Sequence, residues 1–352
     1  MHHLRLRSIC TRFLAAAPAY IIAGVATAQD LLEVPADTQQ VLITDLDVSE
    51  ARIDGNLILG GSDNEPRLQA TSTTIGTGGS LFINTGSTLI TGVGDGLVVN
   101  GSLINQGWLD NRRVVVTGSL VDQTSTLFTG EFIVRPGGTA LFERTIPMFS
   151  SPTTLGRVTV EEGATLTVES GFLVATDIDV DGDADVSAFA EQVSFDVGPT
   201  GTLRLNGFIK GGVSSRGALT LEPQAELQSF VDLIEGSLTI ELSERTRLFG
   251  NINPIEFGGL RIGEEVTLNL VAQEQFELGR SFRIFNGDEF EQASGTFAGL
   301  PDGALGTLSN GQAFRIDYGG GFDGFDIEVT VVPEPAAAVM LLAGGLTLLR
   351  RR

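Results

Sequence analysis

Four aspartates at alternate positions form the densest group of potential metal ligands in this sequence. Asp at positions 1, 3 and 5 with Gly at position 6 matches the first half of an EF-hand calcium loop, in which carboxylate oxygens coordinate the ion. The Glu that would close such a loop at position 12 is replaced by Ala188. The candidate calcium ligands are Asp177, Asp179, Asp181 and Asp183.

The same segment also fits a strand, a turn and a second strand. Apolar residues alternate with the aspartates, which is the period-2 pattern of a half-buried strand. In this interpretation Ile178, Val180, Ala184 and Val186 point inward and the aspartates point outward. Calcium is therefore one of two interpretations, and no other cofactor is expected.

Residues for nucleophilic or acid–base catalysis are scarce. Cys10, His2 and His3 all lie in the first ten residues and no other Cys or His exists. Pairs such as Glu161–Glu162 fit chance adjacency, since the chain has 44 acids. Trp108 beside Arg112 fits either a sugar platform or an exposed strand edge. We expect no enzyme, with a carbohydrate-active enzyme as the alternative.

The charge of the chain limits its partners. The formal net charge is −22, and three arginines lie in each terminal segment. The part between these segments therefore carries a net charge of about −28, which repels nucleic acid and anionic lipid. No nucleic-acid partner is expected.

The first 28 residues have the features of a secretory signal peptide. Three arginines precede an apolar run over 14–25, and the segment closes with Ala26-Thr-Ala28 before Gln29. A basic segment, a short apolar core and a small-x-small ending are typical of a cleaved leader. We expect passage through the Sec translocon and cleavage between Ala28 and Gln29.

The last 21 residues, 332–352, form a second targeting segment. Pro333, Glu334 and Pro335 precede 14 apolar or small residues, followed by Arg350, Arg351 and Arg352. The prolines interrupt strand structure, the apolar stretch predicts a short membrane helix, and the arginines are expected to stay on the cytoplasmic side. This order resembles the PEP-CTERM sorting domain. The resemblance implies processing by an exosortase in a Gram-negative bacterium that makes exopolysaccharide.

The body between the targeting segments repeats a simple pattern of glycine, one or two small residues, and alternating apolar residues. The pattern recurs eight times from Gly101 to Gly236, at an average interval of about 19 residues. Gly is 45 of 352 residues, about twice its usual share. Short strands with regular Gly turns predict an all-β fold, a right-handed parallel β-solenoid, over 29–277. An irregular β-sandwich is the alternative.

Residues 278–331 predict a separate C-terminal β cap. The segments "SGTFAGLP" at 294–301 and "FRIDYGGG" at 314–321 resemble the end of autotransporter-like repeat passengers. Such a module would cover the exposed edge of the last coil.

Together these features predict an exported structural protein of the cell surface or extracellular matrix. The expected route is inner-membrane passage, transient anchoring by the C-terminal helix, and release to the surface. Exopolysaccharide is a possible partner in a biofilm. A calcium-dependent adhesin is a further alternative.

Overall fold

The computed structural model describes residues 19–22, 29–60, 65–123, 127–143, 153–169, 172–191, 193–227, 230–243, 259–286, 293–320 and 326–334. Every regular element among these residues is a β-strand. The chain divides into two compact units, Met1–Val121 and Asp122–Arg352. Each unit contains coils of a parallel β-solenoid, which confirms the predicted all-β solenoid fold.

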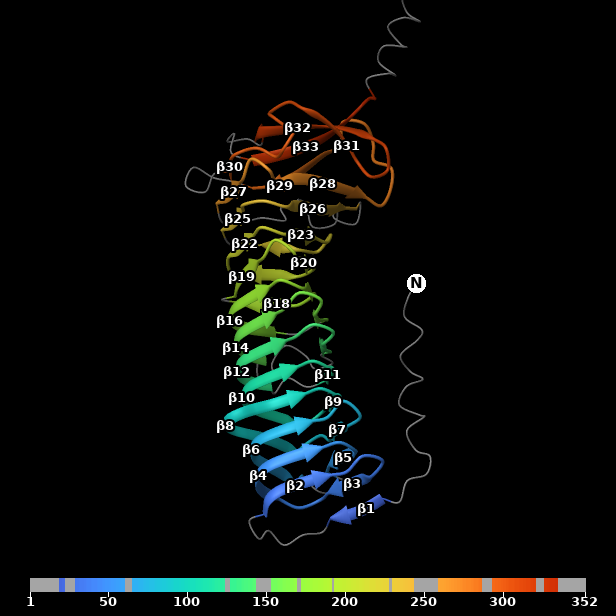
Figure 1. Ribbon diagram of the computed structural model, residues 1–352. Helices are drawn as coiled ribbons and strands as arrows, with labels where there is room; N and C mark the ends of the chain where they lie inside the picture. The colour runs from blue at the N-terminus through green and yellow to red at the C-terminus, as the bar shows by residue number, and fades with distance from the viewer. Residues whose placement is uncertain are drawn as a thin grey trace, which may run out of the picture. The chain divides into compact units, whose positions relative to one another are not determined.

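The first unit has two parallel sheets, and successive strands of each sheet come from successive coils (Figure 1). In one sheet, short strands of mostly four residues follow one another. They are β1 (Ala19–Ile22), β3 (Gln39–Leu42), β5 (Asn56–Leu59), β7 (Ser80–Ile83) and β9 (Ser102–Asn105), and β11 (Ser119–Asp122) ends at the unit boundary. The other sheet is made of β2 (Gln29–Val34), β4 (Leu46–Ile53), β6 (Arg67–Ile75), β8 (Thr88–Val99) and β10 (Trp108–Val116).

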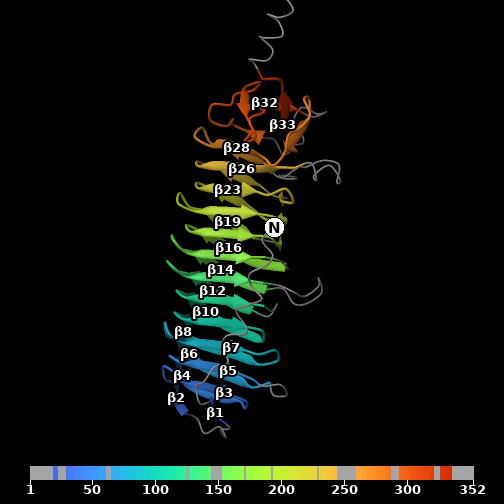
Figure 2. The same cartoon turned by 90° about the vertical axis from the view of Figure 1, so that its right-hand side faces the viewer.

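The second unit repeats this arrangement, and its strands lie side by side in Figure 2. Its short-strand sheet, called sheet A below, consists of β13 (Thr139–Phe142), β15 (Thr165–Val168), β17 (Asp183–Val186), β20 (Thr202–Leu205), β23 (Ala218–Leu221), β26 (Ser237–Leu242) and β28 (Thr267–Ala272). Its second sheet consists of β12 (Leu127–Val134), β14 (Thr153–Val160), β16 (Phe172–Val180), β19 (Ser194–Val197), β22 (Val213–Ser215), β25 (Val231–Leu233), β27 (Leu260–Ile262) and β30 (Ala293–Ser294). Three short strands pair beside it: β18 (Phe189–Glu191), β21 (Phe208–Lys210) and β24 (Glu226–Leu227).

The core is a set of apolar rows that run from coil to coil. In sheet A, Val186, Leu205, Leu221 and Ile240 are in register on successive strands, and each is at most 2% exposed. Burial of one such side chain contributes about 1.5–3 kcal/mol. Because successive side chains of a strand point to opposite faces, the residues next to these buried ones in each strand face solvent.

The repeated glycines have a defined structural role at the corner that leads into sheet A. At most of these corners the glycine carbonyl accepts a hydrogen bond from the residue after the corner glycine of the next coil, as in Ala218 N to Gly201 O at 2.9 Å. In the coil of Gly163 the position is held by Ala164, whose carbonyl accepts from Asp183 N at 3.0 Å. A Cβ added at Gly217 would lie 2.2 Å from the Gly201 carbonyl oxygen. Side chains larger than hydrogen therefore do not fit where the coils stack this closely, and the spacing of the glycines follows the length of a coil.

The C-terminal part of the second unit is an antiparallel sheet in the order β29-β33-β32-β31. These strands are β29 (Ser281–Phe285), β33 (Asp326–Val332), β32 (Ala313–Gly320) and β31 (Leu305–Thr307). The loop between β31 and β32 reaches the outer edge of β28. Ser309 N donates to Leu270 O at 3.0 Å, and Ala272 N donates to Ser309 Oγ at 2.9 Å. The backbone edge of the last sheet A strand is therefore bonded within the chain.

Candidate functional site

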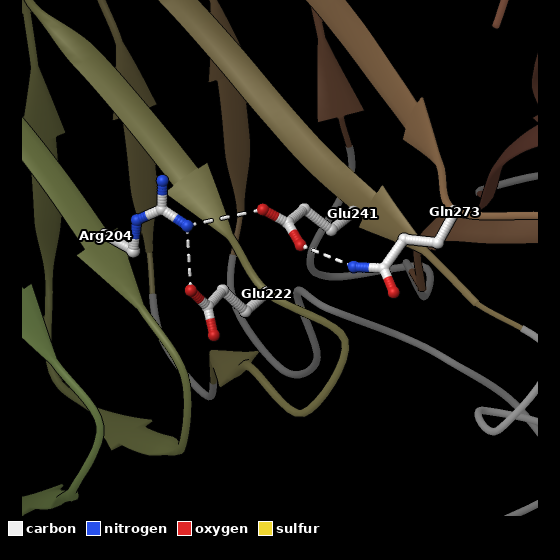
Figure 3. A network of polar contacts seen from close by, with 4 residues as sticks. All are labelled: Arg204, Glu222, Glu241 and Gln273. Atoms are coloured by element: carbon white, nitrogen blue, oxygen red, sulfur yellow. Dashed lines mark hydrogen bonds and ion pairs between the residues drawn. The ribbon is translucent and has the colours of Figure 1, made fainter. Parts of the chain in front are cut away.

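The outer face of sheet A carries a cluster of charged side chains around Arg204 (Figure 3). Arg204 lies on β20 and is in register with Asp185 on β17. Glu222 follows β23 directly, and Glu241 lies on β26. Because residues two apart on a strand share a face, these residues gather on one outer surface although they come from four coils.

The guanidinium group of Arg204 bridges two carboxylates. Its Nη1 lies 2.8 Å from Glu222 Oε1 and 3.3 Å from Glu241 Oε1. The second oxygen of Glu241 accepts a hydrogen bond from Gln273 Nε2 at 3.2 Å. The carboxylates are largely covered, since the Glu222 and Glu241 side chains are 23% and 18% exposed. The cluster is thus a connected network of charge-assisted hydrogen bonds.

The cluster holds more negative than positive charge, and this affects protonation. Burial raises the pKa of Asp185 above its ordinary value, and the charge of Glu222 raises it further, while Arg204 and a hydrogen bond with Ser187 act in the opposite direction. The hydrogen bond with Glu222 raises the pKa of Arg204, so this cation stays protonated. Arg204 therefore interacts with three carboxylates, those of Asp185, Glu222 and Glu241, and Asp185 holds its proton more strongly than usual.

This geometry allows two kinds of chemistry. Glu222 and Glu241 both contact Nη1 of Arg204, so their nearest oxygens lie no more than about 6 Å apart, and two carboxylates this close could act on one sugar as acid and base. The same groups can also accept hydrogen bonds from sugar hydroxyls. Without a substrate, the network links successive coils.

The four aspartates predicted as calcium ligands lie on β16, the following turn and β17. Asp177, Asp181 and Asp183 are exposed, Asp179 is half-buried, and Ile178 and Val180 are buried. Asp179 Oδ2 lies 2.6 Å from Nη2 of Arg157. Within the described part of the chain, no three or more His, Cys, Asp or Glu side chains converge as metal ligands. The segment therefore forms the strand, turn and strand of the second interpretation, and calcium binding stays a prediction.

The predicted targeting residues are described only in part. Pro333 and Glu334 are exposed and follow β33 directly. Gln29 begins β2. The predicted sites Ala26, Ala28, Pro335, Arg350, Arg351 and Arg352 lie outside the described residues. Among the residues that are described, no helix has the length and apolar character needed to span a membrane.

The Arg204 cluster was not predicted from the sequence, although a signal exists. Glu222 and Glu241 each lie five residues after a corner glycine, Gly217 and Gly236. Aligning the coils on these glycines places the two acids in one column, next to the column of Arg204. The sugar platform proposed at Trp108 is supported in one respect only, since Trp108 is 41% exposed on β10.

Comparisons of this chain with protein-family models, with curated proteins and with solved structures found no match.

Proposed function

We propose that this chain is an exported structural protein of a Gram-negative cell surface or exopolysaccharide matrix. The observation that carries the proposal is the stacking of its coils. Apolar inner rows and backbone ladders repeat from coil to coil, while the outer faces carry ion pairs and acids. Such a body is stiff, acidic and well suited to extend through a hydrated polymer layer.

The route to the surface follows from the two ends of the chain. Residues 1–28 act as a leader for the Sec translocon, and 332–352 act as a PEP-CTERM sorting signal with a membrane helix that an exosortase removes. Pro333 and Glu334 are exposed, which suits recognition by a processing enzyme. The coils wind in the right-handed sense usual for parallel crossovers.

The finished protein is poor in catalytic residue types. Removal of the leader eliminates Cys10, His2 and His3. Cys or His nucleophiles, His general bases and Cys/His zinc sites are then excluded by composition. The remaining side chains suit a scaffold better than a catalyst.

The experiment compares a deletion strain, the wild type, and a strain in which residues 333–335 are changed to Ala. We expect loss of biofilm cohesion in the deletion strain. In the Ala strain we expect the protein to stay in the inner membrane with its tail attached. Normal biofilm in the deletion strain would contradict the structural role, and normal processing in the Ala strain would contradict the sorting role.

A carbohydrate-active enzyme is the second candidate, favoured by the Arg204 cluster. Glu222 and Glu241 would supply the acid and base, and Arg204 would bind an acidic sugar. The test incubates the purified protein with the exopolysaccharide and measures new reducing ends and unsaturated uronates. Activity lost in Glu241→Gln but kept in Thr239→Ala, a neighbour on the same face, would support this candidate. Absence of both products with wild-type protein would refute it.

A further inference from the structure

Four residues of the predicted leader, Ala19–Ile22, form the first strand of the solenoid. β1 pairs in parallel with β3, with Ala19 opposite Gln39 and Ile22 opposite Leu42 (Figure 1). These four residues lie within the segment that signal peptidase would remove. In the precursor, the backbone edge of β3 is therefore occupied by the leader.

The groups that face β1 can be assigned from the hydrogen bonds on the other side of β3. Asn56 N donates to Thr38 O at 2.8 Å, and Gly60 N donates to Leu42 O at 2.8 Å. Backbone groups of alternate residues point to opposite sides of a strand. The N–H and C=O groups of Gln39 and Val41 therefore point toward β1. They lose their partners when the leader is removed.

Gln40 on β3 is the polar end of an apolar inner row of the core. Its neighbours in the same inner row, Leu57, Leu81 and Leu103, are almost completely buried. Gln40 Nε2 donates to Glu33 O, whereas its Oε1 is buried and accepts no hydrogen bond from the described residues. A polar side chain with a spare acceptor thus ends an apolar row.

Strand edges in the two units differ in protection. In the second unit, the edge of β28 is bonded by Ser309. In the first unit, Glu33 on β2 is exposed, and edge charges oppose strand pairing. β3 has the sequence Gln-Gln-Val-Leu and carries no charge.

We propose that removal of the leader exposes β3 as a docking edge for a second copy of this chain, which gives an antiparallel, two-fold β3–β3 dimer. This inference rests on the proposed cleavage of the leader. The chemistry is self-complementary, because an amide side chain both donates and accepts and an antiparallel edge pairs with itself. β3 itself brings no charge to the contact, although the chain as a whole is strongly acidic. The two-fold pairing uses the β3 edge of both copies, so assembly stops at two.

The test uses the full chain with a site for a sequence-specific protease inserted between Ala28 and Gln29. The chain is made by cell-free translation in mild detergent, so that the leader stays attached until the protease is added. Sedimentation equilibrium then gives the mass before and after cleavage. We expect a monomer before cleavage and twice the monomer mass afterwards. A cleaved chain that stays monomeric at all concentrations would overturn the proposal.

Val41→Pro and Val41→Ala form the matched pair. Proline removes an N–H that points away from β5, so the ladder to β5 is kept while pairing at the free edge is blocked. We expect the cleaved Val41→Pro chain to be monomeric and the cleaved Val41→Ala chain to be dimeric, with equal circular dichroism. A dimeric Val41→Pro chain would place the interface elsewhere and refute the role of β3. Treatment of the unmodified chain with signal peptidase tests the leader itself, so failure of that cleavage is distinguished from failure to dimerise.

Discussion

Replacement of Arg204 by Gln is the most informative perturbation of the charged network on sheet A. The substitution keeps much of the side chain and one amide donor but removes the cation that contacts both Glu222 and Glu241. Each partly exposed ion pair of this kind contributes about 0.2–1 kcal/mol. Since 43% of the Arg204 side chain is exposed, solvent screening keeps the two contacts in the lower part of that range.

The repulsion between the two carboxylates exists with and without Arg204, so the substitution costs only the two lost attractions. Two contacts in the lower part of that range give an expected destabilisation of these coils of about 0.4–1 kcal/mol. This is a factor of about 2–5 in an opening equilibrium.

Hydrogen exchange read by mass spectrometry is the appropriate assay, because each coil of a solenoid contacts mainly its neighbours. We expect amides of β20, β23 and β26 to exchange about 2–5 times faster in the variant, with little change in β14 and β16. The difference should shrink in 1 M salt, where the screening length is about 3 Å.

The matched control is Arg157→Gln, which removes the more exposed ion pair with Asp179. We expect a smaller effect there, confined to β14 and β16. The reasoning would be refuted if Arg204→Gln left the exchange of β20 to β26 unchanged. It would also be refuted if the acceleration were equal at high and low salt.

Three further predictions concern the same coils. Asp185→Asn should raise stability at neutral pH. The pKa of Asp185 in the fold lies above its ordinary value of 3.8, so the wild type loses stability as pH rises from that value through the raised pKa. The melting temperatures of the two proteins should therefore converge at lower pH, and a variant less stable than the wild type at pH 7 would contradict this. Gly217→Ala should destabilise by about 2 kcal/mol or more because its Cβ would meet the Gly201 carbonyl oxygen, whereas Gly212→Ala, whose Cβ meets nothing closer than 3.9 Å, should unfold in urea like the wild type. Removal of calcium by a chelator should leave the melting temperature unchanged, since Asp179 already pairs with Arg157; a clear drop on chelation, restored by calcium, would instead support the predicted ion site.

The fold was predictable because its constraints are local and repeat along the chain. Alternation fixes which side chains face inward, and glycines recur at most of the corners where two coils approach closely, as at Gly201 and Gly217. Both patterns can be read without knowing which strands pair. The strand, turn and strand of 177–186 was predictable for the same reason.

The charged cluster was harder to predict because it depends on register across coils. Arg204 meets Glu222 and Glu241, which lie 18 and 37 residues away, and a shift of one residue in either strand would move an acid to the opposite face. Pairing of the leader core with β3 was missed for a different reason. The apolar run has the features of a signal peptide, and those features do not indicate which strand edge it can occupy before cleavage.

The covering of β28 was predicted as a function of the C-terminal cap, but its contacts were not. They depend on single polar residues in a loop. Ser309 Oγ accepts from Ala272 N on β28 at 2.9 Å, and in the same loop Gln312 Oε1 accepts from Phe276 N, just after β28, at 2.8 Å. No periodic pattern marks such residues in advance.

The intact mass of the protein recovered from the cell surface tests the central proposal most directly. An exported and processed scaffold predicts a chain that begins at Gln29 and has lost the apolar and arginine-rich residues after Pro335, and that retains its tail when residues 333–335 are changed to Ala. Recovery of the full 352-residue chain, or of the same mass from the wild type and the Ala strain, would contradict it.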